Sequence, residues 1–323
     1  MIRLFSDNRV WVLFLLPVFL GIYYLEIGIL HPNLFLVKIR DQHDFWFAPI
    51  HWARPLILLG QFGLILLNSI VLNWVFNSHE FLDKNAFLIS LNYLIFSSFF
   101  VPFGNPEWIL CAHFFSILAL ASFFQIRQNT DARKQIFNAS LFLGIAALFE
   151  PYLLYLIAFV WWMIFSIRPF NFREWFLSVI GLLLPLSYWM LTSYLCAWQL
   201  NWKALLPPLT FAPIHWLNWS IFGVFILLSV VSLLGLNTRL NKASLRLKKQ
   251  IQLFNVFFIS LVVIGGFLFV ASGNFSLFSF IILPISFYFT YAIMSSGYGI
   301  LAHLLFYGVL LFSFANFVIL YQL

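Results

Sequence analysis

The chain has 323 residues, of which 63% are hydrophobic and 8% are charged, and its formal net charge is +7. Soluble domains carry about 25% charged residues, so the composition excludes a water-facing globular domain and indicates lipid as the solvent. The apolar runs are continuous rather than alternating, which predicts helices instead of a barrel.

Eleven apolar stretches predict membrane-spanning helices, although several are shorter than the roughly 20 residues that an upright span needs. In chain order they lie at about 10–30, 55–76, 87–103, 108–125, 137–150, 151–168, 174–196, 214–235, 253–272, 275–296 and 298–321. Residues 137–168 leave two alternatives open, which are two short helices and one long kinked helix. Proline interrupts the helical hydrogen bonds, so Glu150-Pro151 favours a break.

The basic residues predict the orientation, because Lys and Arg gather on the cytoplasmic side of membrane proteins. With the N-terminus inside and eleven spans, the outer segments hold four of them: Lys38, Arg40, Arg54 and Lys203. The inner segments hold thirteen: Arg3, Arg9, Lys84, Arg127, Arg133, Lys134, Arg168, Arg173, Arg239, Lys242, Arg246, Lys248 and Lys249. A single crossing at 137–168 would move several of these outside, so the charges favour two crossings and an external C-terminus.

The predicted fold is therefore an all-α integral membrane protein, with one polytopic domain over residues 1–323. A belt of tryptophans at the outer boundaries agrees with this topology, because indole rings prefer the headgroup level: Trp46, Trp52, Trp108, Trp198, Trp202, Trp216 and Trp219. The inner segment 236–252 is basic and is expected to be helical. It is interpreted as a face that binds lipid headgroups, or alternatively as a docking site for a cytoplasmic partner.

The first outer loop, 31–54, is the richest segment in polar chemistry. It combines carboxylates, imidazoles and guanidinium groups that could bind a phosphate and supply a general base: Lys38, Arg40, Asp41, His43, Asp44, His51 and Arg54. A plain solvated loop is the alternative interpretation.

A six-residue repeat links this loop to the second long outer loop, 197–213. Phe47-Ala48-Pro49-Ile50-His51-Trp52 recurs as Phe211-Ala212-Pro213-Ile214-His215-Trp216. Both copies precede a span, where proline can start the helix and tryptophan can anchor it. The functional alternative is a pair of related helix entries beside one outer site, each offering a histidine.

Ionisable groups within spans are candidate site residues, because their burial in lipid is costly. Glu26 and Glu150 fit this description best, and Glu26 is expected to reach the interface. His113 and His303 also fall within spans, where a lone histidine is usually a hydrogen-bonded packing residue.

The remaining chemistry predicts no metal site, no tightly held organic cofactor and no nucleic-acid partner. Cys111 and Cys196 have no metal-ligand spacing. Both are predicted on the outer side, where a disulfide could form, although lone membrane cysteines usually pack as small apolar residues.

Part of the chain resembles an uncharacterised bacterial polytopic membrane family, domain of unknown function 6427. The resemblance covers about residues 80–195 and is carried by Lys84-Asn85, by the stretch 135–149, and by Arg168-Pro-Phe-Asn-Phe-Arg-Glu-Trp175 with Gly181 and Pro185. It implies a bacterial inner-membrane location and no established activity.

In architecture the chain also resembles membrane glycosyltransferases that use polyprenyl-phosphate sugars (GT-C type). These have a cytoplasmic N-terminus and a long first outer loop that carries an acidic base, and Asp41 or Asp44 falls at that place. They also tend to have a glycine-rich span that ends near a charged residue, which corresponds to 144–150 here. That residue is usually basic, whereas Glu150 is acidic, and no large outer soluble domain follows the spans.

Three functions follow as hypotheses. The first is a lipid-linked sugar enzyme at the outer face, with Asp44 or Asp41 as the base, Arg40 and Arg54 holding the phosphate, and His51, His215 and Glu150 lining the site. The second is a non-catalytic subunit of an envelope, secretion or motility assembly, with membrane proteins as partners. The third is a transporter or lipid flippase, for which Glu150-Pro151 and Gly265-Gly266 are candidate breaks in helices.

Overall fold

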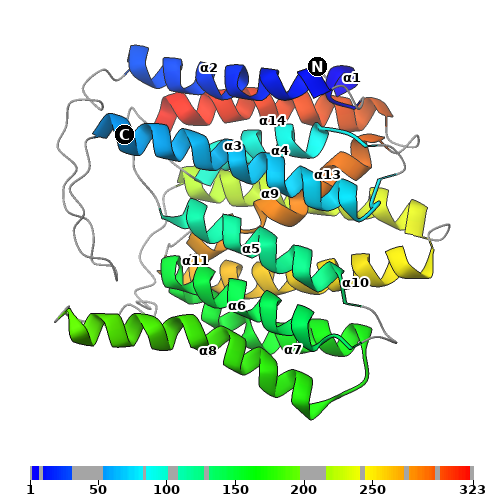
Figure 1. Cartoon of the computed structure of the whole chain (residues 1–323). Coiled ribbons are helices and arrows are strands. Elements are labelled where there is room, and N and C mark those ends of the chain that lie inside the picture. The colour runs from blue at the N-terminus through cyan, green and yellow to red at the C-terminus, as the bar shows by residue number, and fades with distance from the viewer. Residues whose placement is uncertain are drawn as a thin grey trace.

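The computed structural model describes residues 2–6, 10–30, 54–82, 85–100, 108–126, 131–196, 216–240, 244–272, 276–294 and 299–320. These residues are helical almost throughout, and no strand occurs among them. The helices lie side by side and run between two ends of the molecule (Figure 1). In chain order they are α1 (Ile2–Phe5), η1 (Val10–Phe14), α2 (Leu15–Leu30), α3 (Arg54–Ser78), α4 (Leu88–Phe100), α5 (Ile109–Phe124), α6 (Arg133–Phe149), η3 (Pro151–Leu156), α7 (Ile157–Ile167), α8 (Phe172–Leu195), α9 (Trp216–Leu240), α10 (Leu245–Ser260), η5 (Leu261–Gly265), α11 (Gly266–Ser272), α12 (Ser276–Ser279), α13 (Ile282–Met294) and α14 (Gly299–Leu320).

Each predicted apolar stretch coincides with a helical segment, and most boundaries agree within a few residues. The largest difference is α10, which begins at Leu245 because the Ser244 hydroxyl accepts the Leu247 N–H and caps the helix. The described residues include four helices that are long and apolar enough to cross a membrane: Leu58–Ser78, Phe172–Leu195, Arg246–Ser272 and Leu277–Met294. These findings confirm a helical protein with several potential spans, whereas the count of eleven crossings stays a prediction.

The two ends of the bundle differ in what they carry. The basic end is defined by the last residues of α3, α5 and α7 and the first of α10: Ser78, Phe124, Ile167 and Leu245. The loop end is defined by the helix limits that flank the two long segments: Leu30, Arg54, Leu195 and Trp216. Helix α1 lies at the basic end, where the Phe5 carbonyl accepts the Phe87 N–H at 2.8 Å, and α14 finishes at the loop end (Figure 1).

The chain reverses direction at Glu150-Pro151. Glu150 has an extended backbone (φ −138°, ψ 91°) that ends α6, and Pro151 starts the next helical segment. The Phe149 ring stacks with Trp108 at the start of α5, whereas Ile167 shares a cavity with Phe124 at the end of α5. Helices α6 and α7 are therefore antiparallel, which is the arrangement that two crossings require.

The core is built around α12 and α13. Nearly every side chain between Leu277 and Ile293 is buried, and α13 packs against α4, α9, α10 and α14. Some polar side chains of the interior are paired across helices, and such pairing offsets the cost of burying a polar group. Asn92 of α4 donates to Thr290 of α13 at 2.8 Å, and the Tyr23 hydroxyl of α2 bonds with Ser313 of α14 at 2.8 Å.

Helices α6 and α8 approach each other through two glycines. A Cβ atom on Gly144 would lie 2.5 Å from the Leu182 carbonyl oxygen, and one on Gly181 would lie 2.8 Å from the Phe137 carbonyl oxygen. Small residues allow such close backbone packing between membrane helices. Gly144 and Gly181 therefore have a structural role.

The corner between α7 and α8 is stabilised by side-chain contacts. The Asn171 side chain accepts the Arg173 N–H and caps α8. Arg168 lies 3.3 Å from the Glu174 carboxylate, and only 3% of the Glu174 side chain is exposed. Trp175 stacks on Trp161 of α7 with ring centroids 5.3 Å apart. The corner is held by a cap, a buried ion pair and an aromatic stack.

Two irregular turns meet beside the core. Residues Leu261–Gly265 form a π-helical turn, and the chain makes a turn at Phe280–Ile281 between α12 and α13. A Cβ atom on Gly265 would lie 3.0 Å from the Phe278 Cα, so glycine allows α12 to pack closely against the π-helical turn. The candidate break at Gly265-Gly266 is thus a π-helical turn within a helical run that continues from Leu245 to Ser272, and the helix is not interrupted there.

Candidate functional site

Most of the site residues predicted from the sequence lie outside the described residues. This applies to Arg40, Asp41, Asp44, His51 and His215. Arg54 is the first residue of α3, although its side chain is not among those described. Both long segments begin and end at helix limits of the loop end, so the structure brings their attachment points to one end of the bundle.

Glu150 also belongs to the loop end. Its residue exposure is 8%, and it lies in the single extended link between α6 and η3. Its carbonyl oxygen accepts the Leu153 N–H at 3.1 Å, which helps start the new helical turn. The neighbouring Phe149 contacts Trp108, whose side chain is 42% exposed at the same end. The structure thus places a buried carboxyl group at the end from which both long segments start.

Of the two cysteines, neither forms a disulfide. Cys111 of α5 is half-buried and Cys196 after α8 is exposed, and both are free thiols. The structure therefore does not contain the disulfide that the sequence left open.

His113 is a hydrogen-bonded packing residue, as the sequence suggests. Its side chain is completely buried, with Nδ1 3.1 Å from the Tyr93 hydroxyl and Nε2 3.1 Å from the Ser279 hydroxyl. Its ring contacts Phe280 edge-on at 4.4 Å. His113 therefore links α4 and α5 to the turn between α12 and α13.

We expect His113→Ala to lower the free energy of unfolding by about 1–3 kcal/mol, because the Tyr93 and Ser279 hydroxyls would lose a partner in a dry interior. Thermal unfolding of the detergent-solubilised protein measures the change. Ser116→Ala is the matched control, because the Ser116 hydroxyl is buried on the same helix without a hydrogen-bond partner. Equal losses in the two variants would contradict the linking role of His113.

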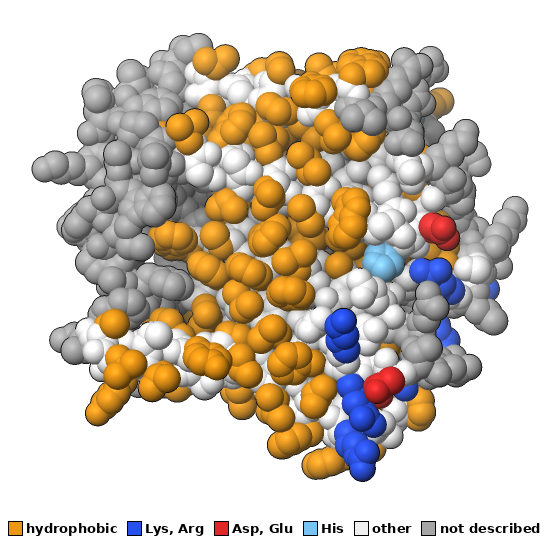
Figure 2. Space-filling view, viewed as in Figure 1, with side chains coloured by type: hydrophobic (Ala, Val, Ile, Leu, Met, Phe, Trp, Pro, Cys, Tyr) orange, Lys and Arg blue, Asp and Glu red, His pale blue; other side chains and the backbone are white. Residues whose placement is uncertain are grey.

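The described basic side chains gather at the basic end. All Lys and Arg side chains that the structure describes lie there: Arg133, Lys134, Arg168, Arg173, Arg246, Lys248 and Lys249. Figure 2 shows Lys and Arg side chains at one end of a face that is otherwise largely hydrophobic. All seven were predicted on the inner side, so the predicted charge segregation is confirmed for these residues. Which side of a membrane this end faces stays a prediction.

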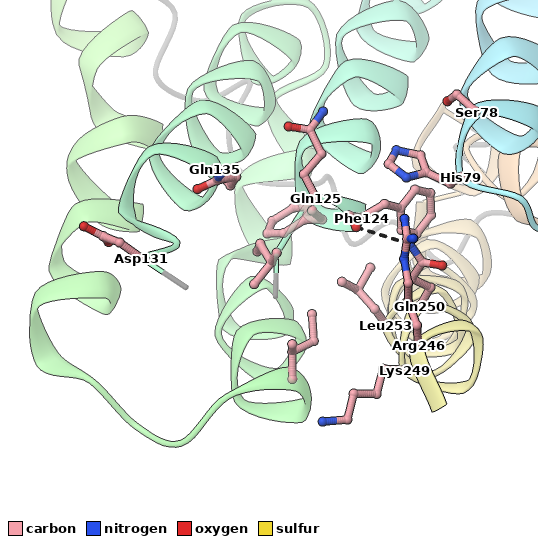
Figure 3. Close-up of a pocket in the computed structure, with 13 residues that line it drawn as sticks. Ser78, His79, Phe124, Gln125, Asp131, Gln135, Arg246, Lys249, Gln250 and Leu253 are labelled. Carbon is pink, nitrogen blue, oxygen red and sulfur yellow. Dashed lines mark hydrogen bonds between the residues drawn. The ribbon is translucent and has the colours of Figure 1, made fainter. Parts of the chain in front are cut away.

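A cavity of about 1130 Å³ opens among these cations. Its polar lining comes from the ends of four helices and their flanking turns (Figure 3): Ser78, His79, Gln125, Asp131, Gln135, Arg246, Lys249 and Gln250. Its apolar lining is Phe123, Phe124, Ile126, Ile167 and Leu253. We call this space the basic-end cavity.

The wall formed by α10 is fixed by a buried amide. The Gln250 side chain is 7% exposed and donates to the Phe124 carbonyl at the end of α5, at 3.3 Å. This contact holds the Arg246 and Lys249 turn of α10 against α5. Opposite it, the Gln135 Oε1 atom of α6 is buried without a hydrogen-bond partner. The cavity is therefore built by packed helices.

Electrostatics in the basic-end cavity favour negative charge. Burial, together with the nearby Arg246 guanidinium, lowers the pKa of His79 below its usual value. His79 also contacts the Phe124 ring edge-on at 5.5 Å. The Asp131 carboxylate accepts the Arg133 N–H at 3.1 Å and lies 3.6 Å from the Arg133 guanidinium, so its charge is already partly neutralised.

Sequence reasoning did not find the basic-end cavity. It identified segment 236–252 as a headgroup-binding face, which includes Arg246 and Lys249, but His79, Gln125 and Gln135 come from separate turns. No spacing along the chain brings these residues together, because their proximity depends on the packing of α3, α5, α6 and α10. The sequence indicated only that the loops next to these residues were predicted on the same, inner side of the membrane.

No family model, curated protein or solved structure matches the chain.

Proposed function

We propose that the chain is a multi-pass enzyme of the bacterial inner membrane that transfers a sugar from a polyprenyl-phosphate donor at the loop end, in a GT-C-like arrangement. The observation that supports it is the segregation of the bundle. Both long segments start and finish at the end that carries Glu150, whereas the described cations gather at the opposite end. The positive-inside rule makes the basic end cytoplasmic, so the loop end would face outward.

The chemistry needs a base and an anion-binding group. Asp44, or Asp41, would remove the proton from an acceptor hydroxyl as its oxygen bonds to the anomeric carbon of the sugar. The bond between that carbon and the phosphate oxygen breaks, and polyprenyl phosphate leaves with the bonding electrons. Arg40 and Arg54 would bind the departing phosphate, since guanidinium groups suit phosphate geometry. His51, His215 and Glu150 would line the sugar site.

The test is the profile of lipid-linked saccharides in cells, measured by mass spectrometry in a deletion strain and in complemented strains. We expect one lipid-linked sugar to accumulate in the deletion, and Asp44→Asn or the Asp41→Asn/Asp44→Asn double variant to fail to clear it. Loss of a general base lowers rates by about 10²–10⁴-fold.

Glu80→Gln is the matched control, because Glu80 is an exposed carboxylate at the basic end, and it should clear the intermediate like the wild type. Full clearance by the double aspartate variant would refute the enzyme. Identical profiles in deletion and wild-type strains would favour a non-catalytic subunit of a membrane assembly instead.

A transporter or lipid flippase is the second candidate, and one observation favours it. The π-helical turn Leu261–Gly265 packs against α12, and the turn at Phe280–Ile281 follows directly. Helices that are interrupted beside buried polar groups often form transport sites. The turn at Phe280–Ile281 separates α12 from α13, and His113 contacts Ser279 next to it. Purified protein in vesicles should then move a fluorescent lipid between leaflets, and absence of movement counts against this candidate.

A further inference from the structure

The basic-end cavity has a composition that a phosphate group would satisfy. It presents a guanidinium (Arg246), an ammonium (Lys249) and an imidazole (His79). Asp131 is the one carboxylate among the described residues that line it, and Asp131 is engaged by Arg133. Cationic donors make the stronger, charge-assisted hydrogen bonds with phosphate oxygens. A bound phosphate would therefore attract both Arg246 and Lys249 and offset the repulsion between these two cations.

Figure 3 shows how the polar groups surround the space. Lys249 extends from α10 into the open region, Arg246 lies beside His79, and Gln125 and Gln135 come from the α5 and α6 side. The amide groups add neutral donors and acceptors next to the cations, which suits the hydroxyl and ester oxygens of a headgroup. The unpartnered Gln135 Oε1 is a buried acceptor that a ligand hydroxyl could satisfy.

The apolar side of the cavity indicates an amphiphile. Phe123, Ile126, Ile167 and Leu253 are buried apolar side chains that line the cavity. A ligand with a phosphate and an attached chain could thus place its charge among the cations and its first methylene groups against these side chains. The volume, about 1130 Å³, is slightly above the roughly 300–1,000 Å³ typical of small-molecule sites.

We infer that the basic-end cavity binds a phosphate-bearing headgroup, supplied either by an anionic membrane lipid or by a soluble phosphate ester. The site lies at the opposite end from the proposed glycosyl-transfer residues, and it does not depend on that function. The inference rests on the convergence of Arg246, Lys249 and His79 on one packed cavity with an apolar wall.

The test uses the full chain in nanodiscs of phosphatidylcholine, with and without phosphatidylglycerol, and native mass spectrometry to count retained anionic lipids. The variant Arg246→Gln/Lys249→Gln should weaken retention about tenfold more than Lys134→Gln/Lys248→Gln. The second pair loses the same charge at the same end, but its side chains are exposed and do not line the cavity.

A milder variant covers the case in which the double substitution impairs folding. Gln125 is exposed and lines the cavity, so Gln125→Glu adds a repulsive charge with little change in shape. Asn85→Asp adds the same charge to an exposed position at the same end, outside the cavity lining. We expect Gln125→Glu to weaken phosphatidylglycerol retention severalfold and Asn85→Asp to leave it nearly unchanged.

The source of the phosphate is decided by competition with glycerol phosphate, which carries the same headgroup chemistry without acyl chains. Displacement of the lipid by glycerol phosphate would support the site and identify a soluble ester as sufficient. Retention of the lipid in its presence, together with loss in the cavity variants, would support a lipid ligand. Equal effects in the cavity variants and their controls would overturn the inference, because charge at the surface alone would then explain binding.

Discussion

Replacing Arg168 by alanine is expected to lower the free energy of unfolding by about 3–5 kcal/mol, the range measured when one partner of a buried ion pair is removed. The Arg168 guanidinium lies 3.3 Å from Glu174 Oε1, and their side chains are 15% and 3% exposed. The other carboxylate oxygen, Oε2, is buried without a hydrogen-bond partner. Without Arg168 the negative charge would lose its ion-pair partner away from water. Unfolding in mixed micelles, followed by tryptophan fluorescence, measures the change.

Arg173→Ala provides the control at the same corner. Arg173 is exposed, so its loss should change stability by less than about 0.5 kcal/mol. The variant Arg168→Met/Glu174→Met should recover most of the stability lost in Arg168→Ala, since it removes both charges and fills the space with apolar atoms. Equal stability of Arg168→Ala and Arg173→Ala would show that the ion pair does not hold the corner between α7 and α8.

The second large effect is expected from Gly144→Ala, at about 1–3 kcal/mol of destabilisation. The new methyl group would lie 2.5 Å from the Leu182 carbonyl oxygen, which belongs to the backbone of α8 and cannot rotate away. Helices α6 and α8 would have to separate along their length, and contacts would be lost on both sides of the glycine. The midpoint of thermal unfolding in detergent measures the loss.

Gly308→Ala is the matched control for this substitution. Nothing lies within 4 Å of a Cβ atom at Gly308 in α14, so alanine should keep or raise stability, by up to about 1 kcal/mol. Gly181→Ala should act like Gly144→Ala, because its methyl group would lie 2.8 Å from the Phe137 carbonyl oxygen. A Gly144→Ala protein as stable as Gly308→Ala would contradict the close packing of α6 and α8.

The helices could be predicted from the sequence because each is encoded locally. A continuous apolar run satisfies its own backbone hydrogen bonds when it forms a helix, so the helix can be predicted without knowing which helices are its neighbours. The reversal at Glu150-Pro151 was also predictable. Proline disfavours a helical conformation of the residue before it and removes a hydrogen-bond donor from its own helical turn. The segregation of the basic residues could be predicted because consecutive helices run in opposite directions. Successive loops therefore lie at opposite ends of the bundle.

The candidate sites were less predictable, because they depend on which helices are neighbours. His113 could be identified as a packing residue, but its partners Tyr93 and Ser279 could not, since Ser279 is 166 residues away along the chain. The basic-end cavity is a similar case, because it requires α10 to lie against α5 through Gln250 and Phe124. The predicted outer-loop residues Asp41 and Asp44 lie outside the described residues, so their site stays a proposal.

The buried position of α13 implies an order of assembly. It is nearly enclosed by α4, α9, α10 and α14, yet the first three of these precede it during synthesis. The ribosome therefore completes much of the surrounding wall before the central helix exists. The hydrogen bond from Asn92 to Thr290 cannot form until Thr290 has been synthesised, 198 residues later. During that interval the earlier helices either leave an opening in the membrane for α13 or pack provisionally and rearrange when it arrives.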